Sequence, residues 1–162
     1  MLRIIAVAAC STLLPLLGGA TPATGALAAP ALQQKDSMST VDLVQVQLLL
    51  PKKVRVGKTF MVMDEVENQG ESIAQNSVTG FFISQDDEFD EKDLLVGGRR
   101  VPALAGRQTS STQTPVTIKA PVPPGDYYFI ALADLRHDLE ERYRNNNTRA
   151  AKVTVEAAKK KE

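Results

Sequence analysis

The residues best suited to chemistry lie in one short acidic segment, residues 85–93. Asp86, Asp90 and Asp93 are spaced four and three residues apart, with Asp87 and Glu88 between them. Calcium takes about six to eight oxygen ligands, and carboxylates that follow the end of a strand could supply several of them. The spacing is not that of an EF-hand, and aspartate is also an ordinary acceptor of N–H bonds in turns. The segment therefore predicts either a weak calcium site or a set of capped turns.

Residues for covalent or acid–base catalysis are scarce. A nucleophilic Ser, Thr or Cys needs a neighbouring base, and the one histidine, His137, lies among charged residues. Zinc needs about three or four Cys or His ligands, and the one cysteine is Cys10. A glycosidase holds two carboxyl groups in a sugar-binding cleft, where different surroundings give them different pKa values. The carboxylates of residues 85–93, in an exposed loop, are not expected to lie in such a cleft. We therefore expect no enzyme activity and no cofactor other than calcium.

The segments that would position these residues are predicted to be short strands. Alternating apolar residues or short apolar runs between turn residues occur in residues 44–50, 60–67, 78–84, 94–101 with a break at the two glycines, 114–119, 127–133 and 151–155. Residues 106–113 are polar and predict a loop, and no segment carries a helical apolar stripe. This pattern predicts an all-β fold, an immunoglobulin-like β-sandwich of about seven antiparallel strands. Asp64 interrupts an inward-facing apolar row, which predicts a bulge or a buried polar partner there.

The first residues have the order of a secretory signal peptide. A positive start, Met1–Arg3, precedes an apolar run, Ile4–Leu17, and a small-residue site, Ala26–Ala28. We expect cleavage after Ala28 and a periplasmic or secreted product, because the run is too short to anchor the chain in a bilayer. A lipidated Cys10 is the competing interpretation, but only nine residues precede that cysteine. Residues 29–40 are predicted to be a flexible linker or, alternatively, a few ordered residues along the domain surface, and residues 157–162 a charged, disordered tail.

Charge excludes two classes of partner. Removing residues 1–28 takes away Arg3 and no acidic residue, which leaves 18 basic and 19 acidic residues and a net charge of −1. That balance gives no electrostatic footprint for nucleic acid or for an anionic membrane. The processed protein would also have no cysteine and therefore no disulfide.

Several short motifs in order resemble the CARDB domain, the cell adhesion related domain found in bacteria. They are Asp42-Leu43-Val44, Val66-Glu67-Asn68-Gln69-Gly70, Phe82-Ile83-Ser84 followed by spaced aspartates, Val101–Leu104, and Pro124-Gly125 with Tyr127-Tyr128, Asp134, Glu141 and Asn146-Asn147. The resemblance covers residues 41–156 and implies a sandwich fold, an exported location and a role in binding or adhesion. It implies no reaction. Arg144 stands where the family often has an acid, which argues against a cation site in that loop.

The same motifs supply the expected turn residues. Asn and Asp tolerate left-handed backbone and bond their own chain in turns, and Gly relieves steric crowding. We expect structural turns at Asn68, Gly70, Gly125, Asp134, Asn146 and Asn147.

Residues 127–133 are apolar on both faces of the expected strand. The resemblance to the family implies that the face with Tyr127 and Phe129 points to the core. The other row, Tyr128, Ile130 and Leu132, is then expected to be partly exposed and to form a partner or dimer face. Burial of a central strand is the alternative explanation. The function predicted from these observations is a non-catalytic module that recognises a protein or a cell-surface polymer. The alternative is a carbohydrate- or calcium-binding accessory domain.

Overall fold

The computed structural model describes residues 40–119 and 121–158. The predicted signal peptide, nearly all of the predicted linker and the last four residues of the tail lie outside these ranges. The strands are β1 (Leu43–Leu49), β2 (Lys53–Arg55), β3 (Thr59–Asn68), β4 (Ser77–Ser84), β5 (Leu94–Val101), β6 (Thr109–Thr117), β7 (Gly125–Leu132) and β8 (Thr148–Glu156). Among the described residues there is no helix long and apolar enough to cross a membrane.

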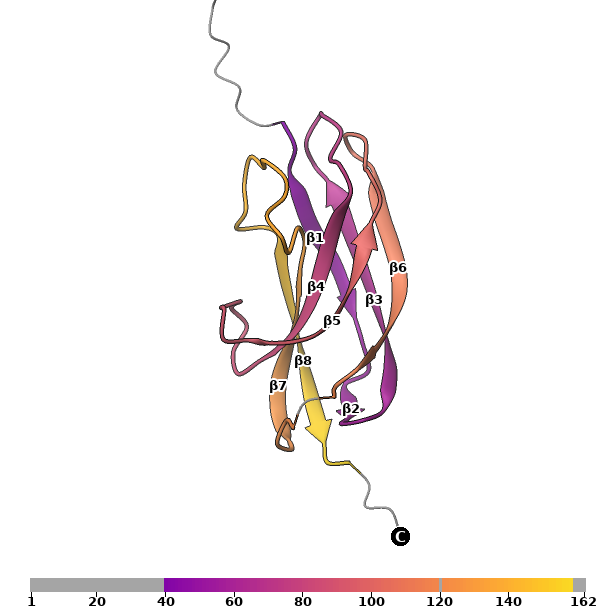
Figure 1. Ribbon diagram of the computed structural model, residues 1–162, viewed down its shortest axis with the longest axis vertical. Helices are drawn as coiled ribbons and strands as arrows, with labels where there is room; N and C mark the ends of the chain where they lie inside the picture. The colour runs from indigo at the N-terminus through magenta and orange to yellow at the C-terminus, as the bar shows by residue number, and fades with distance from the viewer. Residues whose placement is uncertain (1–39, 120, 159–162) are drawn as a thin grey trace, which may run out of the picture. The chain divides into compact units, whose positions relative to one another are not determined.

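The strands form two sheets, one of three strands in the order β1-β3-β6 and one of five in the order β2-β8-β7-β4-β5. The two sheets pack as the layers of a sandwich (Figure 1). The all-β, immunoglobulin-like prediction is confirmed, with eight strands in place of about seven. The additional strand is β2, three residues that pair with β8 in the parallel direction, whereas the other pairings are antiparallel.

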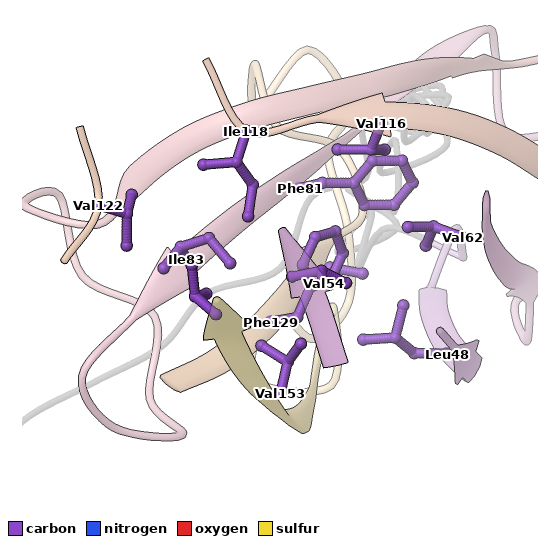
Figure 2. Close-up of a cluster of buried hydrophobic side chains, with 12 residues drawn as sticks. Leu48, Val54, Val62, Phe81, Ile83, Val116, Ile118, Val122, Phe129 and Val153 are labelled. Carbon is purple, nitrogen blue, oxygen red and sulfur yellow. The ribbon is translucent and has the colours of Figure 1, made fainter. Parts of the chain in front are cut away.

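The apolar core lies between the sheets and contains inward-facing residues of both (Figure 2). Phe129 is fully buried, and its ring centroid lies 5.7 Å from that of Phe81 and 6.0 Å from that of Phe60. Tyr127 is partly buried against the same cluster. Aromatic pairs at these separations add to the stability that apolar burial provides. Tyr127 and Phe129 therefore face the core, as the strand parity implied.

The outer face of the five-stranded sheet carries a second apolar cluster. Ile130 is 0% and Leu132 is 5% exposed, and both pack with Phe82. Phe89, from the acidic β4–β5 loop, covers this cluster with its ring centroid 4.8 Å from that of Phe82. The expectation of an exposed Tyr128-Ile130-Leu132 face is therefore wrong at Ile130 and Leu132. Two loops cover them, with Phe89 on one and Leu135 on the other, and only Tyr128 stays partly exposed.

Two strand boundaries also differ from the sequence prediction. Residues 109–113, expected to be a loop, form the first half of β6 and pair with β3. They lack an apolar row because both faces of this part of the strand are largely exposed. β5 continues through Gly97 and Gly98, with a bulge opposite Phe81 and Phe82 in place of the expected break.

Asp64 and Arg99 form a buried ion pair that connects the two sheets. Asp64, on β3, has a side chain that is 0% exposed, and the side chain of Arg99, on β5, is 6% exposed. The Arg99 Nε donates to both carboxylate oxygens at 2.7 and 2.9 Å, and its two terminal nitrogens donate to the hydroxyl and carbonyl of Ser110 on β6. The predicted polar partner of Asp64 is thus an arginine from the opposite sheet. No bulge lies at Asp64, which pairs regularly with Leu48 and Thr112; the register shift of β1 lies between Gln45 and Gln47.

This ion pair gives a first prediction. Replacing Arg99 with Met leaves the Asp64 carboxylate buried without its counter-charge, which should cost about 3–5 kcal/mol of unfolding free energy. Replacing Asp64 with Leu in the same chain removes the stranded charge, so the double variant should recover much of that loss. Urea unfolding of the two single variants and the double variant measures the coupling.

The surface pair Arg55–Glu156 is a matched control, because its side chains are 32% and 39% exposed at a separation of 2.5 Å. Replacing Arg55 with Met should cost only about 0–1 kcal/mol. Equal losses at Arg55 and Arg99 would contradict the role assigned to the buried pair.

Candidate functional site

The loop between β7 and β8 has a buried aspartate as its second residue. Asp134 is 0% exposed and has a φ of 48°, in the left-handed region that Asp tolerates. Its carboxylate accepts the backbone N–H groups of Asp138 and Leu139, each at 3.2 Å. Asp134 therefore shapes the loop from inside.

Glu141 and Asn146 attach this loop to β1 and to the residue before it, and the loop lies beside β1 in Figure 1. Glu141 accepts the N–H of Leu43 at 3.0 Å and the side-chain amide of Asn147 at 2.7 Å. Asn146 donates its side-chain amide to Asp42 at 2.9 Å. Burial raises the pKa of Glu141 from its ordinary value of 4.5, although the bonds from Asn147 and Leu43 oppose that shift.

Arg144 supplies the positive charge in the centre of this loop. Its guanidinium lies 3.4 Å from the Asp134 carboxylate and 3.3 Å from that of Glu141, and it also donates to the carbonyl of Leu139. The Nδ1 atom of His137 lies 2.7 Å from the same guanidinium. The carboxylates of Asp134 and Glu141 and the ring of His137 therefore contact one arginine.

Asn68 holds a second turn at the same end of the domain. It is 0% exposed, accepts the N–H of Gly70 at 3.0 Å and donates to the carbonyls of Ser72 and Leu104 at 2.7 and 3.0 Å. A Cβ on Gly70 would lie 1.9 Å from the carbonyl oxygen of Thr40, so close approach of backbone requires glycine here. Gly125, expected in a turn, is the first residue of β7 and pairs with Val155.

The acidic loop, residues 85–93, lines a surface pocket of about 340 Å³ together with Tyr127 and the segment before β7. The three predicted calcium ligands, Asp86, Asp90 and Asp93, all line it. Each accepts a bond from the loop's own backbone: from Glu88 at 3.1 Å, Lys92 at 2.6 Å and Asp90 at 3.0 Å respectively. No three His, Cys, Asp or Glu side chains in residues 40–119 and 121–158 are grouped so that they could hold a metal. The observed geometry is that of capped turns.

A second pocket, of about 660 Å³, adjoins the first one and shares Gln85 and Tyr127 with it. It is a groove on the five-stranded sheet, lined by Tyr128 and Asp126 of β7, Lys152 and Thr154 of β8, and Lys52. The Lys152 Nζ lies 5.7 Å from the Tyr128 ring centroid, and Thr154 donates to Asp126 at 2.7 Å. We call this surface the Tyr128 groove.

Sequence reasoning identified Tyr128 but missed the rest of the groove. Lys152 and Thr154 alternate on β8 and lie opposite Tyr128 and Asp126 in the β7–β8 register. That alternation was the available signal, although it is also the ordinary pattern of a solvated strand face. Lys52 reaches the groove because the chain before β2 bonds to β8, where the Thr154 N–H donates to the Lys52 carbonyl at 2.8 Å.

Comparisons with known proteins agree with this fold. The CARDB family model matches residues 40–151. The CARDB domain of a Pyrococcus furiosus protein, crystallised in complex with di-metal ions, is similar with a TM-score of 0.55 and 21% identity, over 74% of this chain and 96% of that domain. A domain of a proposed cell surface protein from Methanosarcina acetivorans is similar with a TM-score of 0.55 and 20% identity, over 72% of this chain and 93% of that domain. At these identities the likeness concerns the fold. No curated protein matches the chain.

The raised pKa of Glu141 predicts a pH-dependent contribution to stability. The folded state disfavours the ionised carboxyl, so Glu141 is unfavourable above its raised pKa, and this cost is relieved as the pH falls through that value towards 4.5. Glutamine cannot titrate. The stability of wild type relative to Glu141→Gln should therefore increase as the pH falls from about 7 to about 4. Urea unfolding across that range measures the difference, and a constant difference would contradict the assignment.

The calcium prediction is tested by thermal unfolding. An ion bound only by the folded state raises the melting temperature, so a calcium site in this loop requires that calcium at about 1–10 mM raise it and that Asp90→Asn abolish the rise. Asp87→Asn is the control, because Asp87 lies in the same loop but does not line the pocket. A melting curve that responds to neither calcium nor chelator would leave the three aspartates as turn residues.

Proposed function

The chain belongs to the CARDB family, and on that basis we propose that it is an exported, non-catalytic binding module that recognises a cell-surface polymer through the Tyr128 groove. The observation that supports this role most directly is the composition of the groove, in which the Tyr128 ring lies among charged and hydrogen-bonding side chains and Tyr127 also lines the surface. A tyrosine ring offers an apolar surface with a polar tip, which suits a ligand that is partly hydrophobic and partly solvated. The groove is open to solvent along the sheet, as a polymer would require.

The charges of the groove favour an acidic polymer. Lys52 and Lys152 contribute two positive charges. Among the described residues, Asp126 is the one carboxylate that lines the groove, and it already accepts a bond from Thr154. Carboxylate or phosphate groups on a glycan could pair with the two ammonium groups while a sugar ring packs against Tyr128. The proposed ligand class is therefore a glycan that carries acidic groups.

Two features of the fold suit a module that presents a binding surface. The loop at the Leu132 end of β7 is bonded to β1 through Glu141 and Asn146, whereas the Tyr128 groove lies at the Gly125 end. Binding at the groove would therefore leave the bonded loop in place. Export brings the module to its ligand, and we expect the exported protein to begin at Ala29 when its N-terminus is sequenced.

The polymer proposal is tested on an array of neutral and acidic polysaccharides with the protein purified from the cells that export it. Binding to acidic polysaccharides should weaken about tenfold or more with Tyr128→Ala, because the ring is the central contact. Lys152→Ala should weaken binding less, and should reduce its dependence on salt concentration. Isothermal titration against each polysaccharide that binds gives the affinities.

Arg149→Ala is the matched control, because Arg149 is an exposed basic residue of the same strand that does not line the groove. It should leave the affinity unchanged. Binding to neutral polysaccharides alone would favour a carbohydrate-binding accessory domain without charge recognition. Failure to bind any polysaccharide, together with Tyr128-dependent binding of a purified surface protein, would replace the polymer by a protein ligand.

A further inference from the structure

Each sheet of the domain has two edge strands. Three of these four edges are short, charged, bulged or covered by a loop, whereas the fourth, β6, carries a single protective residue, Pro115, near its end. β2 is only three residues long and carries Lys53 and Arg55. β5 carries a bulge and two consecutive arginines, Arg99 and Arg100. Short length, charge and bulges are the usual devices that prevent edge-to-edge association.

The third protected edge, β1, is covered by the loop between β7 and β8. This loop bonds the carbonyl of Val41 through the N–H of Arg142, the N–H of Leu43 through Glu141, and the N–H of Gln45 through the carbonyl of Asn146. A bulge between Gln45 and Gln47 adds to this protection. The polar loop therefore closes one edge of the three-stranded sheet.

The opposite edge of that sheet, β6, has no bulge in its register and no charged side chain. Its nine residues, Thr109–Thr117, pair one to one with β3. Seven of the nine are Ser, Thr or Gln, and the strand lies at the margin of the sandwich in Figure 1. Among the four edges in the described part of the chain, β6 is the long, regular and uncharged one.

The register shows which backbone groups of β6 face outward. The Asn68 N–H donates to the carbonyl of Gln108, so the even-numbered residues exchange bonds with β3. The odd-numbered residues therefore point their backbone groups away from β3. The carbonyl of Ser111 accepts the hydroxyl of Thr112, which agrees with this parity. Pro115 is also odd-numbered, so its missing N–H costs the β3–β6 ladder nothing.

We propose that β6 pairs antiparallel with β6 of a second copy of this chain, about a two-fold axis within one residue of Thr112. The two three-stranded sheets would then continue into one six-stranded sheet. This inference concerns self-association and does not depend on the ligand of the Tyr128 groove.

A second copy fits this edge for three reasons. An antiparallel strand presents the same alternation of donors and acceptors to its copy, as an isologous two-fold interface requires. The uncharged side chains bring no like charges together across the axis, which charged edge strands would do. Pro115 lies towards one end of the strand, so pairing near Thr112 keeps the outward N–H groups of Ser111 and Gln113 available.

The first test compares Ser111→Pro with Ser111→Ala in sedimentation equilibrium. Proline removes an outward N–H without touching the β3 ladder, and it should raise the dimer dissociation constant about tenfold or more because each dimer loses two bonds. Alanine keeps the N–H and should leave the constant nearly unchanged. One strand pair is a small interface, so the mass is measured up to about 1 mM protein. Equal melting temperatures at low protein concentration show that Ser111→Pro still folds.

The second test uses disulfide cross-linking with Cys10 replaced by serine. Cysteine is introduced singly at Ser111, Thr112 and Gln113, and the one nearest the axis should form a disulfide-linked dimer, since paired Cα atoms lie about 4.5–5.5 Å apart. Thr109→Cys is the control on the same exposed strand. Depending on which residue lies on the axis, the two Cα atoms at position 109 would lie about 14–27 Å apart, which is too far for a disulfide.

Cross-linking at one central position, with the control unlinked and Ser111→Pro monomeric, supports the proposal. A wild-type chain that stays monomeric at every concentration overturns it, as does a dimer that Ser111→Pro leaves intact. A monomeric chain whose β6 binds an extended strand of another protein would likewise overturn self-pairing.

Discussion

The buried ion pair between Asp64 and Arg99 is the constraint on which the arrangement of the two sheets depends. The apolar core would tolerate small sliding of one sheet over the other, because hydrophobic attraction has no direction. The hydrogen bonds of Arg99 to both carboxylate oxygens of Asp64 and to two atoms of Ser110 are directional. They fix β5 of one sheet relative to β3 and β6 of the other. Such a pair adds little net stability compared with an apolar contact of the same volume, but it is costly to break on one side.

Polar residues at the end of the sandwich near Leu132 act in a related way. Asp134, Glu141 and Arg144 bond one another and the backbone of their own loop, and Glu141 also bonds β1. The motif residues that resemble a family signature therefore maintain a loop that also closes the free edge of β1. The Tyr128 groove lies at the other end of β7, and the side chains available for a ligand there come from three separate segments. The structural role and the proposed binding role thus lie at different ends of one strand.

Residues on strands with two apolar rows show the limit of reasoning from a pattern. Alternation in residues 127–133 identified a strand, and family parity placed Phe129 in the core. Neither could show that Phe89 and Leu135, on two loops, cover Ile130 and Leu132. The opposite error occurs in β6. Its first residues have the polar sequence of a loop, and they form a strand because they pair with β3. An edge strand needs no apolar row, since it gains its stability from the ladder on one side.

The amino-acid sequence by itself determined the all-β class, the sandwich, the family and most strand positions, because these follow from local alternation and from turn residues that act over a few positions. It also placed Asp64 in an inward row and so predicted a bulge or a polar partner there. Tertiary structure alone decided that this partner is Arg99, 35 residues away. It also decided that Lys52 and Lys152 meet Tyr128, and that Arg144 lies against Asp134 and Glu141. Contacts of this kind depend on which strands become neighbours, and that is set by the packing of the whole core.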